Sequence, residues 1–527
     1  MPVPMSFVPR FLLAALAGGA LNLAFPHLRW WWMAIVALAL LHVALGRSRP
    51  GRAFAYGTAF GLAFFLPHLS WAITSVGTYI PWAALATLQA CIIGLYACLR
   101  AVALKSAWYT RSASVWIDAV GSGLLFVAIE GMRSRFPFGG FAWGLVGYSQ
   151  VEGPIVRLAA YGGTTLVGFT VVVAAVLLAR VINPAGERSG RFLSRAAQVA
   201  VAGALPLVAA LAPLAGNAET GSLSVGVVQG NVPRPPLADG YEQARRVTAN
   251  HRDETVRLVK SDPQLDLIVW PESASDLDPR TNDDVLAMIH ESVLAAKVPI
   301  LVGTQEYFEN GRYNQHLLFV PDGNDVRIVD SYTKQHPVPF GEYIPYRDFF
   351  AKISSDVGKV RTDMLPGQKP GIMDLALADR NVRVGDAICF EISVEDLVRD
   401  SVNRGAQVLI VPTNNASFGD SAEAAQQTDI SRFRAIEFSR ATVQASTVGT
   451  SAIIDPRGRI VGATELWTSD HLVAKVALRT SETFAAKAGI IPVLGSAILA
   501  LGWVVVGPFT GEKRASRRHY SDLQRKR

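Results

Sequence analysis

Cysteine and charge are both scarce in this 527-residue sequence. It has three cysteines, and 18% of its residues are charged, which is below the roughly 25% of ordinary soluble domains. Cys91 and Cys98 lie in one apolar run and are interpreted as small packing residues. Cys389 is alone in the more polar region 218–484, so that region can form no internal disulfide, and its free thiol is a candidate reactive group.

The sequence also lacks the features of a nucleic-acid-binding or metal-binding protein. Its formal net charge is +7, but the basic residues gather between apolar runs and in the tail "GEKRASRRHYSDLQRKR" rather than in a basic and aromatic patch. The nine histidines show no ligand spacing such as His-Glu-x-x-His. We therefore expect no nucleic-acid partner, no metal and no cofactor.

Long apolar runs account for the high hydrophobic content, which is 50% of all residues. A membrane-spanning helix needs about 20 mainly apolar residues, and the sequence predicts a multi-span α-helical membrane domain of about eight transmembrane helices. The runs cover residues 9–25, 30–46, 53–73, 80–104, 115–132, 158–181, 196–214 and 488–509. No small-residue cleavage site follows the first run, so we expect it to be retained rather than removed as a signal peptide.

Basic residues between the runs predict the orientation, because cytoplasmic loops of membrane proteins are enriched in lysine and arginine. They lie in alternate connections and in the tail: Arg47, Arg49, Arg52, Lys105, Arg111, Arg188, Arg191 and Arg195, with seven more after the eighth run. We therefore expect a multi-pass membrane protein with both termini in the cytoplasm. The domains expected are 1–217 with seven transmembrane helices, a domain over 218–484 on the outer side of the membrane, and 485–527 with the last helix and a basic tail. The outer side is the periplasm if the cell has a second membrane.

One apolar run ends in ionisable residues. Within "LLFVAIEGMRSRFPFGGFAWGLVGYSQ", Glu130 is followed by Arg133, by Arg135 and then by an aromatic, glycine-rich loop. Ionisable residues at membrane depth usually face a cavity or a partner. Two interpretations stay open. The first is an interfacial Glu130–Arg133 pair that ends the helix, and the second is a docking loop for lipid headgroups or lipoproteins, with Trp143 and Tyr148 as candidate substrate-binding residues.

Strand-like and helical patterns alternate through residues 218–484. "LSVGVVQGN", "LDLIVWPES", "PILVGTQ" and "QVLIVPTN" are interpreted as buried strands with helices between them. "NQHLLFVPDG" and "VRIVDSYTK" predict a hairpin around an aspartate-glycine turn. The run "GDAICFEIS" (385–393) is interpreted as the end of another strand. The alternation predicts a layered α/β sandwich.

Three predicted strand ends carry a chemically reactive side chain. Glu272 follows "LIVWP", Lys334 follows "VDSYT", and Cys389 ends "VGDAI". Functional groups on strand ends converge at one rim of a layered α/β fold. A carboxylate can act as the base for a thiol, and a fixed ammonium can stabilise the oxyanion formed when a thiolate attacks a carbonyl. Each residue alone has an ordinary structural explanation: packing for the cysteine, a cap for the glutamate and an exposed strand end for the lysine.

Together the segments around these residues resemble a known superfamily. "WPES", "YTKQHPVPFGEYIP" and "GDAICFE" are similar to the segments that carry the Glu-Lys-Cys triad of the nitrilase superfamily. The eight apolar runs around that domain, with "FAWGLVGYSQ", "VQGN" and "TNNASFGDS", resemble the bacterial apolipoprotein N-acyltransferases. The resemblance covers essentially the whole chain. It implies a nitrilase-like αββα sandwich for residues 218–484.

The resemblance also implies roles for five residues. Cys389 would be the nucleophile, Glu272 the general base, and Lys334 the group that stabilises the tetrahedral intermediate. Glu342, in "PFGEY", would be a second carboxylate that positions the lysine or the attacking amine. Glu391 would be a supporting carboxylate beside the nucleophile.

The sequence departs from this family at several positions. Leu237 and Ala238 stand near the place where the family often has a tryptophan, Ser417 stands where it tends to have an aromatic residue, and Phe390 replaces a tyrosine. We expect these changes to affect substrate preference or loop closure more than the chemistry. Phe418, next to Ser417, is a candidate substrate-binding residue.

The reaction implied by the resemblance is a two-step acyl transfer. The Cys389 thiolate would take an acyl group from a phospholipid, phosphatidylethanolamine in the family, and pass it from a thioester to the α-amino group of a diacylglyceryl-cysteine on an apolipoprotein. A membrane-tethered amidase or nitrilase acting on a small amide is the alternative enzyme. A non-catalytic scaffold or transporter is a third possibility, although the sequence shows none of the related halves with interrupted segments that many transporters have.

Overall fold

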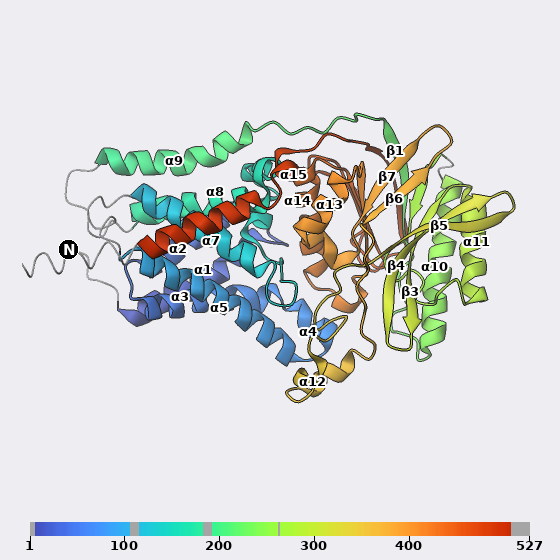
Figure 1. Ribbon diagram of the computed structural model, residues 1–527, viewed down its shortest axis with the longest axis horizontal. Helices are drawn as coiled ribbons and strands as arrows, with labels where there is room; N and C mark the ends of the chain where they lie inside the picture. The colour runs from blue at the N-terminus through green and yellow to red at the C-terminus, as the bar shows by residue number, and fades with distance from the viewer. Residues whose placement is uncertain (1–5, 106–114, 183–191, 262–263, 507–527) are drawn as a thin grey trace, which may run out of the picture. The chain divides into compact units, whose positions relative to one another are not determined.

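The computed structural model describes residues 6–105, 115–182, 192–261 and 264–506. Arg111, Arg188, Arg191 and the basic tail, on which the predicted orientation partly depends, lie outside the described residues. Contacts divide the chain into two compact units, drawn in Figure 1. The helical unit takes the described residues of 1–70, 79–212 and 490–527, and the sandwich unit takes residues 71–78 and 213–489.

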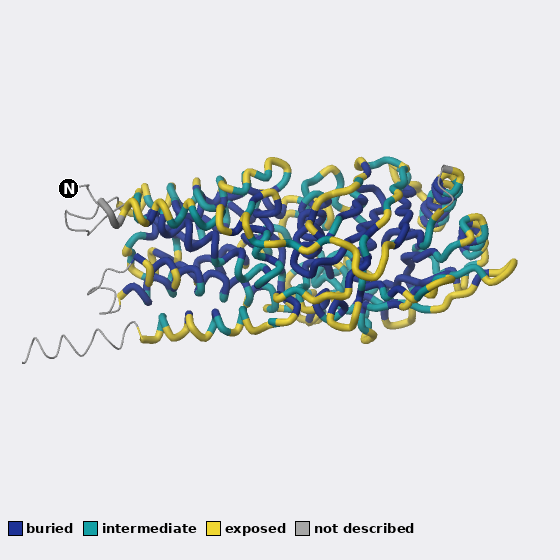
Figure 2. The backbone as a smooth tube through the Cα atoms, turned by 90° about the horizontal axis from the view of Figure 1, so that it is seen from above, coloured by how far each residue is buried: buried dark blue, intermediate teal, exposed yellow. Residues whose placement is uncertain are grey.

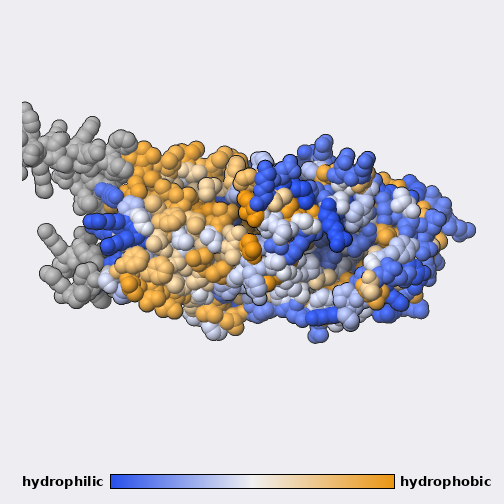
Figure 3. Space-filling view, turned by 90° about the horizontal axis from the view of Figure 1, so that it is seen from below, coloured by the Kyte–Doolittle hydropathy of each residue, from blue (hydrophilic) through white to orange (hydrophobic). Residues whose placement is uncertain are grey.

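The helical unit consists of apolar helices, and each predicted apolar run overlaps one of them. They are α1 (Phe7–Leu21), α2 (Trp32–Leu45), α3 (Pro50–His68), α5 (Tyr79–Ala103), α7 (Val115–Arg133), α8 (Ala159–Ile182), α9 (Phe192–Ala210) and the helix Ile491–Val506. Four described segments are long and apolar enough to cross a membrane: Phe7–Ala24, Tyr79–Ala103, Val115–Arg133 and Pro154–Ile182. Eight crossings therefore stay a prediction. Figure 3 shows mainly hydrophobic side chains over the visible face of this unit.

Small residues bring α3 and α5 close together. A Cβ atom added at Gly61 would lie 2.5 Å from Cα of Ala90, and one added at Gly57 would lie 2.8 Å from Cβ of Ala97. Such distances leave no room for a larger side chain. Helices in membranes commonly associate through such small residues, because close backbone approach increases van der Waals contact.

Glu130 and Arg133 are both buried inside the helical unit. The Arg133 guanidinium donates to the carbonyl oxygens of Trp143 at 2.9 Å and Gly144 at 3.0 Å. Oε1 of Glu130 accepts from the backbone N–H of Val146 at 2.9 Å and lies 3.5 Å from the Arg133 guanidinium. The pair therefore lies buried at the end of α7 and anchors the glycine-rich loop through hydrogen bonds.

The sandwich unit contains two six-stranded mixed sheets. The first has the strand order β12 (Asp470–Ala477), β1 (Ser222–Gln229), β2 (Leu267–Val269), β3 (Ile300–Phe308), β4 (Gly311–Asp322) and β5 (Asp325–Thr333). The second has the order β11 (Ile460–Ala463), β10 (Ala452–Ile454), β9 (Thr442–Ser446), β8 (Val408–Thr413), β7 (Asn381–Asp386) and β6 (Ile372–Ala376). The central strands β1–β2–β3 and β7–β8–β9 run parallel within their sheets.

Because side chains alternate between the two faces of a strand, the first sheet has one apolar layer on each face. Leu267 and Val269 of β2 join the core between the two sheets, whereas Ile268 and Trp270 pack into the cluster beneath the helices. Successive side chains of a strand point to opposite faces, so a strand covered on both sides must be apolar throughout. The continuous hydrophobic runs of the sequence have this cause, and Figure 2 shows the buried residues concentrated inside each unit.

Two helices cover the outer face of each sheet, as Figure 1 shows. The first sheet carries α10 (Gly240–Ser261) and α11 (Asp283–Ala296), and the second carries α13 (Glu395–Asn403) and α14 (Glu423–Phe438). Gly226 in β1 lets α10 approach, because a Cβ atom there would lie 2.8 Å from the Leu258 side chain. The four layers form the αββα sandwich that the sequence predicted.

The sequence interpretation was wrong about the segment that carries Cys389. Strand β7 ends at Asp386, and Cys389 begins a 3-10 turn, η5 (Cys389–Ser393), instead of continuing the strand. Its φ of 57° lies in the left-handed region, which is uncommon for a residue with a side chain. The run reads as a strand because this turn lies in the core, where Ile388 and Ile392 are both buried.

Candidate active site

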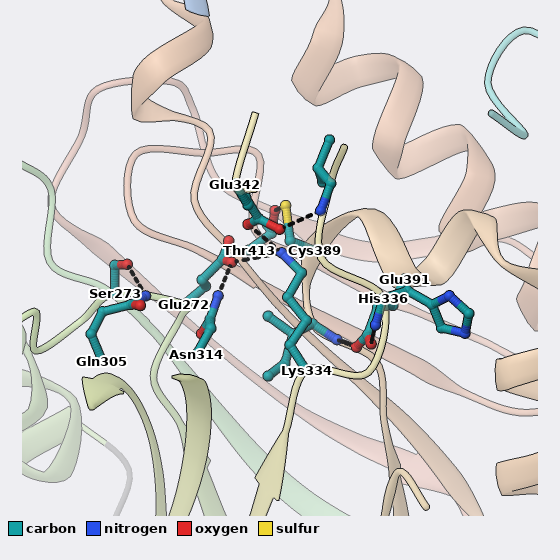
Figure 4. A network of polar contacts seen from close by, with 12 residues as sticks. Glu272, Ser273, Gln305, Asn314, Lys334, His336, Glu342, Cys389, Glu391 and Thr413 are labelled. Atoms are coloured by element: carbon teal, nitrogen blue, oxygen red, sulfur yellow. Dashed lines mark hydrogen bonds and ion pairs between the residues drawn. The ribbon is translucent and has the colours of Figure 1, made fainter. Parts of the chain in front are cut away.

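The ends of three strands bring the predicted triad residues together in the sandwich unit. Glu272 lies three residues beyond β2, Lys334 directly follows β5, and Cys389 lies three residues beyond β7. Figure 4 shows the two carboxylates of Glu272 and Glu342, the ammonium of Lys334 and the sulfur of Cys389 turned toward one another.

Lys334 is the fixed positive charge of the site and is fully buried. Its Nζ lies 2.6 Å from Oε1 of Glu342 and 3.3 Å from Oε1 of Glu272. Burial lowers the pKa of Lys334, but the two carboxylates outweigh burial and raise that pKa above its ordinary value. The two carboxylates therefore favour the charged lysine, which can stabilise negative charge.

Glu272 has a second partner that the sequence did not reveal. Nδ2 of Asn314 donates to the same Oε1 atom at 2.6 Å, and Asn314 is itself buried on β4. The backbone N–H of Lys334 donates to the carbonyl oxygen of Asn314 at 2.9 Å. Asn314 therefore connects the carboxylate and the lysine and holds them at a constant separation.

Cys389 has two polar neighbours at its sulfur. The Thr413 hydroxyl lies 3.3 Å from Sγ, and Nε2 of Gln427 lies 3.8 Å from it. Burial of the thiol raises the pKa of Cys389, and the Glu272 and Glu423 carboxylates raise it further, while Lys334 lowers it. The residue as a whole is only partly buried.

Glu342 is held from two sides. Its Oε1 accepts from Lys334, and its Oε2 accepts from the backbone N–H of Val338 at 2.7 Å. The backbone N–H of Glu342 in turn donates to the carbonyl oxygen of Val338 at 2.8 Å. This small loop fixes the carboxylate against the ammonium.

Glu391 connects two backbone segments. Its Oε1 accepts from the N–H groups of Gln335 at 2.7 Å and His336 at 2.9 Å, and its Oε2 accepts from the N–H of Ile388 at 2.8 Å. The Tyr332 hydroxyl lies 3.0 Å from both oxygens. Burial raises the pKa of Glu391 to about 7, and the neighbouring ammonium and the backbone N–H groups oppose this. Since donors occupy both oxygens, Glu391 holds together the segments just after the lysine and just before the cysteine.

The predicted substrate-binding residues are not all in this unit. Trp143 and Tyr148 are buried in the helical unit, Tyr148 within the turn η2 (Val146–Gln150). Phe418 belongs to the sandwich unit, in the turn η6 (Ala416–Phe418). Its ring lies 5.3 Å, edge to face, from that of Trp71, which begins the short helix α4 (Trp71–Val76).

Sequence reasoning missed the neutral polar residues of the site. Asn314, Thr413 and Gln427 touch a triad residue; Thr413 begins the quoted segment "TNNASFGDS", whereas Asn314 and Gln427 lie in none of the quoted motifs. The available signals were the polar residues that follow or start apolar strands, in "NQHLLFV" and in "IVPTNN". Among the described residues, no group of three or more His, Cys, Asp or Glu is placed to hold a metal ion.

Together these contacts make a site suited to acyl transfer through sulfur. A thiol near a carboxylate can lose its proton, and a buried ammonium can stabilise the oxyanion of a tetrahedral intermediate. The two flanking carboxylates, Glu342 and Glu391, each hold a part of this arrangement in place.

Comparison with known proteins matches both parts of the chain. The family described as apolipoprotein N-acyltransferase N-terminal domain matches residues 17–177, and the carbon-nitrogen hydrolase family matches residues 224–486. A solved amidase of the nitrilase superfamily from Nesterenkonia AN1 is 16% identical with a TM-score of 0.37, over 54% of this chain and 99% of its own.

Two curated relatives match nearly the full length. A protein of Mycolicibacterium smegmatis called apolipoprotein N-acyltransferase is 35% identical over 94% of this chain and 86% of its own. One with the same description from Azotobacter vinelandii is 30% identical over 94% of this chain and 95% of its own. The chain therefore belongs to the apolipoprotein N-acyltransferase family.

Proposed function

We propose that this protein transfers a fatty acyl group from a phospholipid to the N-terminal diacylglyceryl-cysteine of apolipoproteins, through a thioester on Cys389. The observation that carries the proposal is the position of Lys334, fully buried between two carboxylates within the cluster that includes the thiol. Family membership supports acyl transfer to lipoproteins in general. Phosphatidylethanolamine is the donor we expect.

In the first step, Glu272 accepts the thiol proton of Cys389, and the thiolate attacks the ester carbonyl carbon of the phospholipid. The oxyanion of the tetrahedral intermediate is stabilised by the Lys334 ammonium. The ester C–O bond then breaks, and Glu272 returns the proton to the departing alkoxide. The products are a lysophospholipid and a thioester on Cys389.

In the second step, the neutral α-amino group of the apolipoprotein attacks the thioester carbonyl. Glu272 accepts a proton from the amine, the C–S bond breaks, and the proton passes to the departing thiolate. An amide is formed and the free thiol is restored. The acyl-transfer energy comes from the ester, so the cycle needs no nucleotide.

The location that we propose is the bacterial inner membrane. Eight crossings with both termini in the cytoplasm would place residues 218–484 in the periplasm, between a membrane domain over 1–217 and a last span and basic tail over 485–527. The apolar helices of the helical unit support a multi-pass protein. Cysteine and reporter labelling of the loops from either side of the membrane measures this topology.

Reconstitution tests the reaction directly. The full-length protein in detergent–phospholipid micelles is incubated with an acyl-labelled phospholipid and a diacylated lipopeptide, and mass spectrometry follows the triacylated product. We expect that product together with a lysophospholipid. If no triacylated lipopeptide forms while small amides are hydrolysed, the membrane-tethered amidase is the correct alternative.

A further inference from the structure

A series of hydrogen-bonded neutral and acidic side chains leads away from the Cys389 sulfur. These side chains lie on β8, on α14 and on the segment between them, and none belongs to the predicted triad. Thr413 is the last residue of β8, Asn415 lies two residues further on, and Glu423 and Gln427 lie one turn apart at the start of α14. All four are buried, with at most 2% of their surface exposed. Their hydrogen bonds run in series from the carboxyl group to the thiol.

Hydrogen bonds determine which way the side-chain amides of Asn415 and Gln427 are turned. Nδ2 of Asn415 donates to Oε2 of Glu423 at 2.7 Å and to Oε1 of Gln427 at 2.9 Å. Oδ1 of Asn415 accepts from the Ser446 hydroxyl at 2.6 Å. Because Oε1 of Gln427 accepts from Asn415, the Gln427 side chain must turn its NH₂ group toward Sγ of Cys389.

The Thr413 hydroxyl has one hydrogen atom and two possible acceptors. It lies 2.9 Å from Oε1 of Gln427 and 3.3 Å from Sγ of Cys389. A neutral thiol is a weak acceptor, so the hydrogen favours the amide oxygen while the sulfur is protonated. A thiolate is a charged acceptor and forms stronger hydrogen bonds, so the hydrogen then favours the sulfur.

We propose that Thr413 and Gln427 donate hydrogen bonds to the Cys389 thiolate, and that Asn415 and Glu423 hold these two donors in position. The two donors act when the thiolate forms and again when it leaves in the second step. They stabilise a charge that burial and the nearby carboxylates oppose. Once the thioester has formed, the sulfur is neutral and the Thr413 hydrogen returns to Gln427.

Thiol alkylation measures this effect without any acyl transfer. The full-length protein is treated with iodoacetamide across a range of pH, and mass spectrometry follows the peptide that contains Cys389, so the other two cysteines do not interfere. In Thr413→Val the midpoint of the pH–rate profile should move upward by about one to two pH units, the effect of one lost hydrogen bond to a charged group. Gln427→Met should move it in the same direction by less, because 3.8 Å is the longer contact.

Two further variants separate this role from simple packing. Thr413→Ser keeps the hydroxyl and should restore the wild-type profile. Thr442→Val removes a buried hydroxyl from the neighbouring strand β9 whose hydrogen bond goes to the carbonyl oxygen of Arg440. It should leave the profile unchanged.

An unchanged alkylation profile in a folded Thr413→Val protein would overturn the inference. If Thr413→Val does not fold, an unchanged profile in Gln427→Met overturns it as well. The inference depends on Cys389 being the nucleophile, but experiments can disprove the thiolate donors and the proposed reaction independently of each other. A wild-type protein that makes triacylated lipopeptide with an unshifted Thr413→Val profile disproves only the thiolate donors. A shifted profile without any triacylated product disproves only the proposed reaction.

Discussion

The ammonium of Lys334 lies 2.6 Å from Oε1 of Glu342, closer than its 3.3 Å distance to Glu272. Glu342 therefore makes the shorter ion pair with the lysine, and Oε1 of Glu272 is shared between the lysine and Nδ2 of Asn314. In the proposed reaction the two carboxylates have different roles: Glu342 positions the cation, and Glu272 is the base.

Removing the lysine charge tests this arrangement. Lys334→Met leaves two carboxylates facing each other without a counter-charge, and breaking a buried ion pair in this way costs about 3–5 kcal/mol of folding free energy. Loss of an oxyanion-stabilising group lowers kcat by at least roughly 100- to 1000-fold. Thermal unfolding and lipopeptide acylation measure the two effects.

Lys359→Met is the matched control for stability. Lys359 is partly exposed and pairs with Asp356 in the same unit at 3.2 Å. Since exposed ion pairs contribute at most about 1 kcal/mol, this variant should unfold near the wild-type temperature. Equal destabilisation by both substitutions would contradict the importance of the buried pair.

Asn314→Asp should move the acid limb of the activity profile. The new carboxylate would lie in hydrogen-bond contact with Glu272, and two carboxylates at that distance cannot both ionise easily. The pair should therefore hold a proton to higher pH, and the pH at which acylation reaches half its maximum should increase by about one unit or more. Asn314→Ala, which removes the donor without adding charge, should reduce activity with a much smaller shift. An acid limb that stays in place in Asn314→Asp would argue against Glu272 as the base.

Cys389→Ala should abolish acyl-enzyme formation, because no other described side chain of the cluster is a thiol. The measurement is incubation with acyl-labelled phospholipid, followed by denaturing electrophoresis with and without hydroxylamine. The wild-type protein should retain label that hydroxylamine removes, and Cys389→Ala should retain none. A hydroxylamine-sensitive acyl group on Cys389→Ala would refute the assigned nucleophile. Cys389→Ser should likewise form no thioester.

The sequence predicted the layers and the charged groups of the site because both leave local patterns. Continuous apolar runs mark strands covered on two faces, and the charged triad residues follow directly after such runs. Asn314 and Gln427 left no such pattern. Their roles depend on contacts with Glu272 and Cys389, which lie 42 and 38 positions away in the chain.

The turn at Cys389 was mistaken for a strand for a related reason. The turn lies in the core, so the residues on both sides of the cysteine must be apolar. A buried turn and a buried strand therefore have similar sequences. The segment Trp71–Val76 was also missed, because only the assembled unit shows Nε1 of Trp71 donating to Oε1 of Gln426 at 3.1 Å. The predicted apolar run 53–73 divides here into α3, which ends at His68, and the short helix α4.

Glu391 is predicted to act through position rather than chemistry. Glu391→Gln would turn an NH₂ group toward donors that now meet a carboxylate, so at least one backbone N–H loses its acceptor. We expect a loss of about 1–3 kcal/mol in folding free energy. The kcat should fall while the KM for lipopeptide stays similar.

Tyr332→Phe provides the graded comparison. It removes one of the donors to Glu391 and leaves the three backbone N–H groups in place. Its effect on stability should be smaller, about 1 kcal/mol. If Tyr332→Phe lowered stability and kcat as much as Glu391→Gln, the backbone hydrogen bonds would not be the main role of the carboxylate.

Glu423 gives a prediction about the pH dependence of stability. Burial raises the pKa of this carboxyl to about 8, and the Glu272 charge adds to the rise, while the Asn415 hydrogen bond opposes it. An unfolded glutamate has a pKa of about 4.3, so between these values the folded protein holds a proton that the unfolded chain has lost. Its contribution to stability is therefore full below about pH 4 and is lost as the pH rises toward 8.

Glu423→Gln should remove that dependence, because the amide keeps an acceptor for Nδ2 of Asn415 but does not titrate. Thermal unfolding of the wild-type protein and the variant between about pH 5 and 9 gives the comparison. As the pH rises, the Tm of the wild-type protein should fall relative to the Tm of Glu423→Gln. Most of this relative fall should be complete near pH 8. Other buried carboxyls, such as Glu437, titrate in both proteins and cancel in the difference. Parallel curves would show that Glu423 is ionised in the folded protein throughout this range, and its hydrogen bond to Asn415 would then be a charged one.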